Sequence, residues 1–327
     1  MPEQFNYTSV LAPYMNMMLQ RKEAAGLVVY RMRWILKEFD AFANAENLGT
    51  QHITENFIEK WKKTRIADSA GTMYAKNSVW HQLTKFMCRC GCECYIPTLP
   101  RQPKPNATPY IYTKEQITSI FKATDECRLR GTCMNTVIFP MPALLRLLYG
   151  TGMRISEALS IKNSDLHLDE NYIHLKKTKN GRERIIPINA SLSDVLREYI
   201  TNRNRMPIKE VSMPNQSLFI KPDGTVLTRC VVLSNFRKLL EKCGIPFKGN
   251  HAGPRIHDLR HTFAVHALVQ MSQSGMDLYT CLPILSTCLG HTTLAATEQY
   301  VRLTNSFYPE LESQCSSISA FIYPKTH

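Results

Sequence analysis

The chain has 327 residues, 44% of them hydrophobic and 20% charged, which is typical of a globular protein of two domains and excludes a disordered chain. Lys and Arg number 40 against 27 Asp and Glu, so the net charge of +13 favours a polyanionic partner, most simply nucleic acid. The sequence has no apolar run of about 18 residues and no basic region followed by a hydrophobic stretch at its N-terminus. We therefore expect neither a membrane-spanning helix nor a signal peptide, and a location in the cytoplasm.

Helical periodicity dominates the first hundred residues, with almost no strand signal. The periodic segments are residues 10–22, 28–46, 53–65 and 72–87. The pattern predicts a small all-α domain over residues 1–96.

Four cysteines alternate near the end of this region, at Cys88, Cys90, Cys92 and Cys94. In a chain of this size without a secretory signal, reduced thiols are expected. Zinc sites usually space their thiolates as Cys-x2-4-Cys, which alternation does not match. We interpret the run as a helix end and a turn with Gly91 breaking the helix, and keep a metal or redox role as the alternative.

A proline-rich segment follows, with five prolines between Tyr95 and Tyr110. Such a segment cannot continue a helix and predicts an extended linker, which we place at residues 97–112. Thr113 followed by Gln116 matches a capping box that opens a helix. A second domain is therefore expected over residues 113–327.

The second domain shows mixed periodicity. Helices are expected around residues 142–150, 155–161, 192–203, 231–243, 257–270, 278–289 and 295–300, and short strands at 165–168, 172–177 and 183–188. Asn180 and Gly181 predict a tight hairpin turn between the last two strands. The result is a mainly helical domain with a small antiparallel sheet, and the amphipathic stretch beyond Tyr300 predicts a tail helix packed on its own domain.

Chemically distinctive residues recur in the second domain. They are Arg154 with Glu157 in GTGMRISEAL, Lys179 in KTKNGRER, His257 and Arg260 in a His-x-x-Arg motif, and His291 of Leu-Gly-His with Tyr300 nine residues on. Guanidiniums and imidazoles can bind phosphate oxygens, and a phenol can attack phosphorus. In this order and spacing, the set resembles the tyrosine recombinase (integrase) family.

The chemistry of phosphoryl transfer suggests roles for the arginines. Planar guanidiniums donate two parallel hydrogen bonds to non-bridging oxygens, so Arg154 and Arg260 are the expected clamps. The resemblance implies that Tyr300 is the nucleophile. Glu157, one turn after Arg154, is interpreted as an acceptor that orients the arginine cluster, with an ordinary surface carboxylate as the alternative.

Histidines are expected to support the same reaction. His257 and Arg260 lie three apart on a predicted helix and so share a face. The resemblance implies that His257 contributes proton transfer or a phosphate hydrogen bond, and that His291 donates to a non-bridging oxygen. His261 and His266 match no motif position and are assigned to packing or solvent.

The leaving 5′-oxygen needs a proton, which a hairpin lysine could give. Lys176, Lys177 and Lys179 compete for this role. The family places its lysine five residues before the arginine of the following strand, here Arg184, and this selects Lys179. Lys176 and Lys177 are then expected to meet backbone phosphates, with the choice among the three still open.

The resemblance also implies that the helical domain, residues 1–96, grips one face of the target site. The basic residues that we place toward phosphates are Lys62, Lys63, Arg65, Lys76 and Lys85. For each of them the alternative is an ordinary solvated helix face.

Taken together, the motifs predict a site-specific recombinase or integrase that cleaves duplex DNA through a 3′-phosphotyrosyl intermediate. The covalent bond conserves the phosphodiester energy, so neither a cofactor nor a metal is expected. The alternatives are a type IB topoisomerase, which relaxes supercoils as a monomer, and a non-catalytic DNA-binding protein.

The family further implies a homotetramer assembled on specific DNA sites, with or without accessory proteins, in which the tail can pack on its own or on a neighbouring protomer. The stretch at residues 123–145 is longer than a compact housekeeping enzyme needs. This favours a role in transposition or integration of a mobile element over resolution of chromosome dimers. We expect association with the nucleoid.

Overall fold

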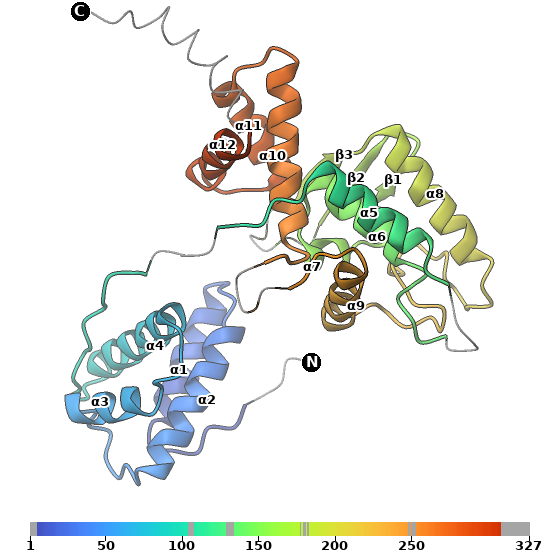
Figure 1. Cartoon of the computed structure of the whole chain (residues 1–327). Helices are drawn as coiled ribbons and strands as arrows, with labels where there is room; N and C mark the ends of the chain where they lie inside the picture. The colour runs from blue at the N-terminus through green and yellow to red at the C-terminus, as the bar shows by residue number, and fades with distance from the viewer. Residues whose placement is uncertain are drawn as a thin grey trace, which may run out of the picture. The chain divides into compact units, whose positions relative to one another are not determined.

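The computed structural model describes residues 5–103, 108–128, 134–176, 178, 181, 183–247, 249 and 253–308. The chain forms two compact units, Met1–Asn106 and Ala107–His327 (Figure 1). The linker predicted at residues 97–112 stays a prediction. Within the described ranges, no helix is long and apolar enough to cross a membrane.

The regular elements in the described part of the first unit are all helices. Its helices are α1 (Ala12–Ala24), α2 (Tyr30–Ala45), α3 (Glu55–Lys63) and α4 (Ala70–Arg89). The side chains of Thr54 and Ser69 cap α3 and α4 by accepting hydrogen bonds from backbone N–H groups of the first turn. Phe39 stacks on Trp80 with ring centroids 3.8 Å apart, and Trp61 meets both rings edge-on. These aromatic rings form the centre of the unit's core.

The cysteine run begins at Cys88 in the last turn of α4, which ends at Arg89. Gly91 has φ +90°, a left-handed conformation that suits a helix-ending turn, as interpreted from the sequence. The thiols of Cys88 and Cys94 donate to the backbone carbonyls of Cys94 and Gln51. Among the described residues, no group of three or more His, Cys, Asp or Glu side chains could hold a metal ion.

The second unit combines helices with one small sheet. Its elements are α5 (Lys114–Asp125), α6 (Met141–Thr151), α7 (Ile155–Ala158), the 3₁₀ turn η1 (Asn163–Asp165), β1 (Leu166–His167), β2 (Tyr172–Leu175), β3 (Arg184–Pro187), α8 (Ala190–Asn204), α9 (Arg229–Lys242), α10 (Asp258–Gln273), α11 (Leu278–Leu289) and α12 (Ala295–Phe307). The capping box of Thr113 and Gln116 opens α5 as predicted. The predicted fold class, mainly helical with a small antiparallel sheet, is confirmed.

The sheet has the strand order β1-β2-β3 and is antiparallel throughout. Ile173 of β2 pairs with Ile186 of β3, and both are buried. Because side chains alternate along a strand, this register fixes the positions of their neighbours, and Arg184 pairs with Leu175. The predicted hairpin turn is described only at Gly181, with φ +69°, since Asn180 lies outside the described residues.

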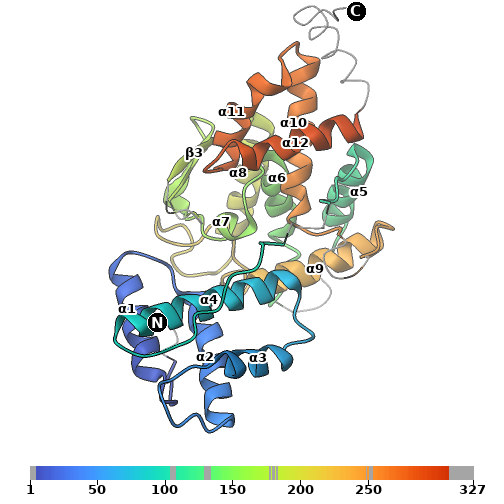
Figure 2. The ribbon, with the colours of Figure 1, turned by 90° about the vertical axis from the view of Figure 1, so that its left-hand side faces the viewer.

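Two apolar clusters fill the second unit. The larger one joins α5, α6, α8, α9 and the sheet, and it includes Leu259 from the first turn of α10. The smaller one joins α10, α11 and α12, which lie side by side in Figures 1 and 2, and it includes Leu268 and Tyr300. Helix α10 therefore belongs to both clusters and connects them. The amphipathic tail predicted to form a helix continues to residue 327, of which 309–327 lie outside the described residues.

Candidate active site

A buried carboxylate organises the start of α7. Helix α6 ends in the left-handed residue Gly152, and Arg154 follows as the residue before α7. The carboxylate of Glu157 accepts hydrogen bonds from the backbone N–H of Arg154 at 2.9 Å and from its Nη1 at 2.8 Å. Glu157 is only 1% exposed, so the alternative of a surface carboxylate is wrong. This double contact holds the Arg154 side chain in one orientation.

A second guanidinium reaches the same carboxylate from β3. Arg184 donates from Nη2 to Glu157 Oε2 at 2.8 Å and from Nη1 to Oε1 at 3.2 Å, and its Nε donates to the carbonyl of Cys288 at 3.3 Å. Burial raises the pKa of Glu157, but the hydrogen bonds and charges of Arg184 and Arg154 outweigh burial and leave that pKa lowered. In the sequence, Arg184 serves only as the reference position for the hairpin lysine. A basic residue opening an otherwise apolar strand was the signal that it belongs to the site.

Gly290 makes room for Arg184 at the end of α11. It has φ +65°, and a Cβ built on it would lie 2.7 Å from Arg184 Nη1. Replacing Gly290 by Ala should therefore displace the Arg184 guanidinium from Glu157. The rate of the DNA cleavage that the resemblance implies should fall about 100-fold, the order expected for a misplacement of about 1 Å. Single-turnover cleavage on a nicked DNA substrate measures this.

The matched control is Gly244→Ala, because Gly244 has φ +68° but nothing within 4 Å of an added Cβ. It should cost about 1–2 kcal/mol of unfolding free energy from backbone strain and leave cleavage near the wild-type rate. Equal loss of cleavage in both variants would show that strain, not the Arg184 contact, is responsible.

Arg260 of α10 connects the ends of two other helices. Its Nη1 donates to the carbonyl of Gly152 and its Nη2 to the carbonyl of Leu289, both at 2.8 Å. These carbonyls lie at the C-terminal ends of α6 and α11, where a positive charge is favourable. Burial and the charge of Arg154 lower the pKa of Arg260 to about 10, so the group remains charged at neutral pH. Arg260 is 3% exposed and is held rigidly.

His291 completes the contacts of Arg260. Its Nε2 lies 3.0 Å from Arg260 Nη2 and its Nδ1 lies 2.7 Å from Thr297 Oγ1. A guanidinium only donates, so Nε2 is the acceptor and the proton of the neutral ring lies on Nδ1. Burial and the charges of Arg260 and Arg154 lower the pKa of His291 to about 4. Its predicted donation to a phosphate oxygen requires the proton to be on Nε2 and stays a prediction.

Tyr300 of α12 lies within this cluster. Its ring is nearly parallel to that of His291, at 7° with centroids 6.2 Å apart, and the residue is 1% exposed. Burial raises the pKa of Tyr300, against the charges of Arg260 and Arg154, which lower it. The structure thus brings Arg154, Arg260, His291 and Tyr300 together from three separate motifs.

His261 makes the contact that the sequence analysis missed. Its Nδ1 lies 2.9 Å from the Tyr300 hydroxyl, so its assignment to packing or solvent is wrong. The available signal was its position directly after Arg260 on a helix, one turn from His257. His266, by contrast, binds the hydroxyl of Tyr149 at 2.9 Å and packs away from the cluster as expected.

His257 stands at the edge of the cluster. It is the residue before α10, not inside the helix, so the predicted shared helical face with Arg260 is only approximate. Its ring meets that of His261 edge-on, with centroids 5.0 Å apart. Desolvation of the ring and the nearby His261 and Arg260 lower the pKa of His257 to about 4, although the residue keeps an exposed side.

A model of the phage integrase family matches residues 111–306, which is more than half of the chain. The chain belongs to this family, the tyrosine recombinases. It is therefore an enzyme of the DNA strand transferase type.

Individual relatives agree with this assignment. Over 279 residues the chain is 31% identical to a protein of Sinorhizobium fredii named as an integrase/recombinase, y4rB, a match covering 84% of this chain and 86% of that one. It is 33% identical over 164 residues to tyrosine recombinase XerC of a Roseiflexus species, covering 50% of this chain and 48% of the relative.

Solved structures are similar in fold. The XerH recombinase bound to its palindromic difH substrate superposes with a TM-score of 0.64 at 20% identity, over 85% of this chain and 77% of that one. The Tn1549 transposon integrase in complex with transposon end DNA gives a TM-score of 0.61 at 17% identity, over 90% of this chain and 99% of that one.

The lysines of the recombinase hairpin are only partly described. Lys179, the predicted proton donor, and Lys177 lie outside the described residues. Lys176 donates to the buried carboxylate of Asp165 at 2.7 Å, and this hydrogen bond raises the pKa of Lys176. A phosphate would have to compete with Asp165 for this ammonium.

Two of the basic residues predicted to face DNA in the first unit are bound internally. Lys76 is 9% exposed, and its Nζ lies 2.7 Å from both Asp68 and Glu38. The Nε of Arg65 lies 3.0 Å from Glu38. Buried ammonium groups need such partners, because an unpaired buried charge is strongly unfavourable. The prediction of Lys76 as a phosphate contact is therefore wrong, and Arg65 could contact a phosphate only with the nitrogens that Glu38 does not bind.

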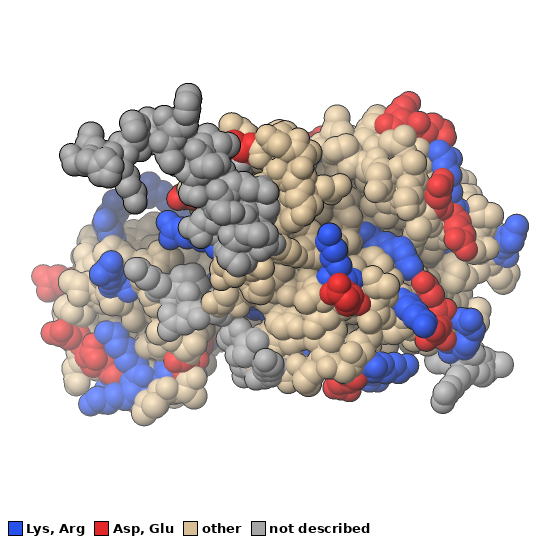
Figure 3. Space-filling model, turned by 45° about the horizontal axis from the view of Figure 1, so that its top comes forward, with Lys and Arg blue, Asp and Glu red and all other residues tan. Residues whose placement is uncertain are grey.

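The remaining predicted contacts differ in exposure. Lys62 pairs with Glu59 at 2.7 Å, whereas Lys63 and Lys85 are exposed. On the face drawn in Figure 3, basic and acidic side chains of the coloured residues are interspersed and form no continuous basic stripe. Charge on this face alone does not identify a DNA-binding surface.

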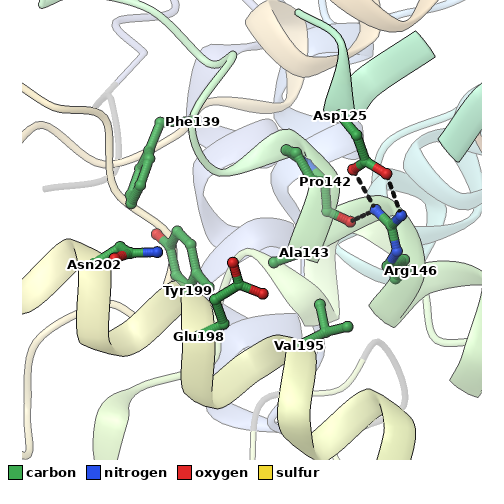
Figure 4. Close-up of a pocket in the computed structure, with 9 residues that line it drawn as sticks. All are labelled: Asp125, Phe139, Pro142, Ala143, Arg146, Val195, Glu198, Tyr199 and Asn202. Carbon is green, nitrogen blue, oxygen red and sulfur yellow. Dashed lines mark hydrogen bonds and ion pairs between the residues drawn. The ribbon is translucent and has the colours of Figure 1, made fainter. Parts of the chain in front are cut away.

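A cleft of about 390 Å³ lies between α6 and α8, apart from the residues above (Figure 4). Arg146 closes one side through paired hydrogen bonds to Asp125, at 2.7 and 3.0 Å. Its lining residues are Asp125, Phe139, Pro142, Ala143, Arg146, Val195, Glu198, Tyr199 and Asn202. None of the candidate catalytic residues contributes to it.

Proposed function

We propose that this recombinase cleaves one strand of a specific duplex site by attack of Tyr300 on a phosphodiester. The attack forms a 3′-phosphotyrosyl bond and releases a 5′-hydroxyl, and the 5′-hydroxyl of a partner strand reverses the step. The observation that carries the proposal is the position of the Tyr300 phenol in a buried cluster with Arg260 and His291.

The guanidiniums supply the electrostatic part of the proposal. Negative charge builds on the non-bridging oxygens during phosphoryl transfer, and fixed donors stabilise it without reorganisation. Arg154 is the more accessible clamp, with 19% of its side chain exposed, while Arg260 is held by two carbonyls. Arg154, Arg184 and Arg260 carry three positive charges and Glu157 one negative charge, so two positive charges in excess remain to face one phosphate.

Lys179 is the proposed donor of a proton to the leaving 5′-oxygen, with His257 as a second source of proton transfer. A substrate with sulfur in place of that oxygen has a far better leaving group and hardly needs the proton. Lys179→Ala should therefore be slow on normal DNA and largely rescued on the sulfur substrate in single-turnover assays. Arg154→Ala should not be rescued, because its contacts are with the non-bridging oxygens.

Lys177→Ala serves as the comparison for this experiment. Rescue of Lys177→Ala in place of Lys179→Ala would assign the proton to the neighbouring lysine. Rescue of neither variant would make His257 the next candidate.

The proposed partners are specific duplex DNA and further copies of the chain. Structures of similar fold contain DNA, including those of XerH and the Tn1549 integrase. Two strand exchanges require four active sites, so we propose a homotetramer on DNA, with accessory proteins as further partners. The 3′-phosphotyrosyl bond conserves the energy of the phosphodiester, so the proposed reaction uses neither a cofactor nor a metal.

Within the family, we propose that this recombinase integrates or transposes a mobile element. The likeness to a protein named as an integrase/recombinase, and to a transposon integrase, supports this role. Resolution of chromosome dimers is the competing role. Sequencing the DNA that flanks the gene would distinguish them, since element ends beside the gene support the proposal and their absence contradicts it.

A suicide substrate with a nick near the cleavage position tests the reaction itself. The proposal expects a covalent protein–DNA adduct on a denaturing gel and joining only between matched sites. Relaxation of supercoils without site specificity would indicate a topoisomerase, and specific binding without an adduct would indicate a non-catalytic DNA-binding protein.

A further inference from the structure

We propose that His261 is a catalytic residue that accepts the phenolic proton of Tyr300 as the tyrosine oxygen bonds to phosphorus. The proposal rests on the proposed role of Tyr300 as nucleophile. Its starting observation is the distance of 2.9 Å between His261 Nδ1 and the Tyr300 hydroxyl, which lies within reach of a proton transfer.

The surroundings of Tyr300 leave few other acceptors. The residue is 1% exposed, so bulk water has almost no access to its hydroxyl. The nitrogens of His291 are both engaged, Nε2 by Arg260 and Nδ1 by Thr297. Guanidiniums cannot accept a proton. Among the described residues, the imidazole of His261 is therefore the base in contact with the hydroxyl.

The charge state of His261 suits an acceptor. Burial and the positive charges of Arg260 and Arg255 lower its pKa to about 4, with a smaller effect of His291 in the same direction. The ring is thus neutral at pH 7 and can accept at Nδ1. A bound DNA phosphate would offset the charge of Arg260, so the basicity of His261 should rise when the substrate arrives.

The proposed step balances in both directions. The Tyr300 oxygen forms a bond to phosphorus, its proton passes to His261 Nδ1, and the bond from phosphorus to the 5′-oxygen breaks. The leaving oxygen takes its proton from a separate donor, for which Lys179 is proposed. In rejoining, a 5′-hydroxyl attacks phosphorus and His261 returns the proton to the departing Tyr300 oxygen.

The two residues lie on helices that share a core. Side chains of α10 and α12 pack in the cluster that contains Leu268, Tyr300 and Val301. The buried hydroxyl must become accessible to the DNA phosphate, and a movement of these helices as one unit would carry the His261–Tyr300 pair with it. The same α10 helix holds a second pair of identical distance, His266 with Tyr149 at 2.9 Å, outside the cluster.

The variant His261→Gln keeps a hydrogen-bond acceptor but removes the base. We expect unchanged specific DNA binding and a rate of adduct formation on the nicked suicide substrate that is about 100- to 10,000-fold lower. The matched control is His266→Gln, which alters the second pair and should form the adduct near the wild-type rate. A loss in His261→Gln no greater than in His266→Gln, or a faster rate than wild type, would overturn the proposal.

A second measurement separates proton transfer from structural damage. Replacing Tyr300 by a fluorinated tyrosine makes the phenol more acidic, so the base matters less. The loss caused by His261→Gln should then shrink at least about tenfold, while the loss caused by Arg154→Lys should persist. An equal loss with both phenols would overturn the proposal. If the wild-type enzyme forms no adduct, or Tyr300→Phe still forms one, the proposed function itself fails.

Discussion

Tyr300→Phe should bind specific DNA within a few fold of the wild-type affinity and form no covalent adduct. The substitution removes only the hydroxyl oxygen, and the ring remains in the core shared by α10, α11 and α12. Removal of that oxygen also abolishes the hydrogen bond between Tyr300 and His261. Denaturing gels of a nicked substrate measure the adduct, and gel-shift assays measure binding.

The matched control is Tyr149→Phe, which removes the tyrosine hydroxyl that contacts His266 of α10. It should form the adduct near the wild-type rate. An adduct in Tyr300→Phe would assign the nucleophile to another residue, whatever the control shows.

Arg154→Lys and Arg260→Lys should each lower the cleavage rate about 100- to 1,000-fold, equivalent to about 3–4 kcal/mol of transition-state stabilisation. Lysine keeps the charge but cannot form the planar, two-pronged contact with phosphate oxygens. Single-turnover cleavage on the nicked substrate measures the rate, and thermal unfolding reports any loss of stability.

The two variants differ in their structural consequences. Arg260 donates to Gly152, Leu289 and His291 from a buried position, so its replacement should also destabilise the fold. Arg154 is more exposed, and its side chain binds only Glu157 among the described residues, so Arg154→Lys should unfold near the wild-type temperature. Arg197→Lys, in an exposed pair with Asp169, is the neutral control. Near-normal cleavage by Arg154→Lys would show that its guanidinium is structural.

The fold class could be predicted because local patterns agree with it. Helical periodicity, the capping box at Thr113 and the alternation of Ile173 and Leu175 each identify an element without knowledge of its partners. The predicted helix at residues 155–161 is one turn long, Ile155–Ala158. Its glutamate points back to Arg154 at the helix start, which a periodicity count does not capture.

The site was predictable where motifs specify it and not where tertiary contacts do. Arg154, Arg260, His291 and Tyr300 lie in motifs of fixed spacing, and the structure brings them together, although their roles stay proposals. Arg184 pairs with Glu157, which is 27 positions away in the sequence. The pattern of strand β3 alone could not predict this pair.

In the first unit, the positive charge of a residue could be read from the sequence but its burial could not. Lys76 is positive and lies on a helix, and in the sequence these properties fit a phosphate contact as well as they fit an internal ion pair. Its partners Glu38 and Asp68 come from elsewhere in the chain, and only the fold places them around it. The adjacency of His261 to Arg260 was visible, but its pairing with Tyr300 crosses 39 residues.

The separation of the second unit into two apolar clusters makes the position of Tyr300, the proposed nucleophile, dependent on the stability of the smaller cluster. Tyr300 belongs to the smaller cluster of α10, α11 and α12, whereas Glu157 and Arg184 adjoin the larger one. Regions with small cores open at a lower free-energy cost than the whole domain. Arg260 lies in the first turn of α10 and donates to carbonyls at the ends of α6 and α11. It therefore links the larger, more stable cluster to the smaller, more labile cluster of α10, α11 and α12. Breaking these contacts of Arg260 would let α10, α11 and α12 move while most of the protein stayed folded.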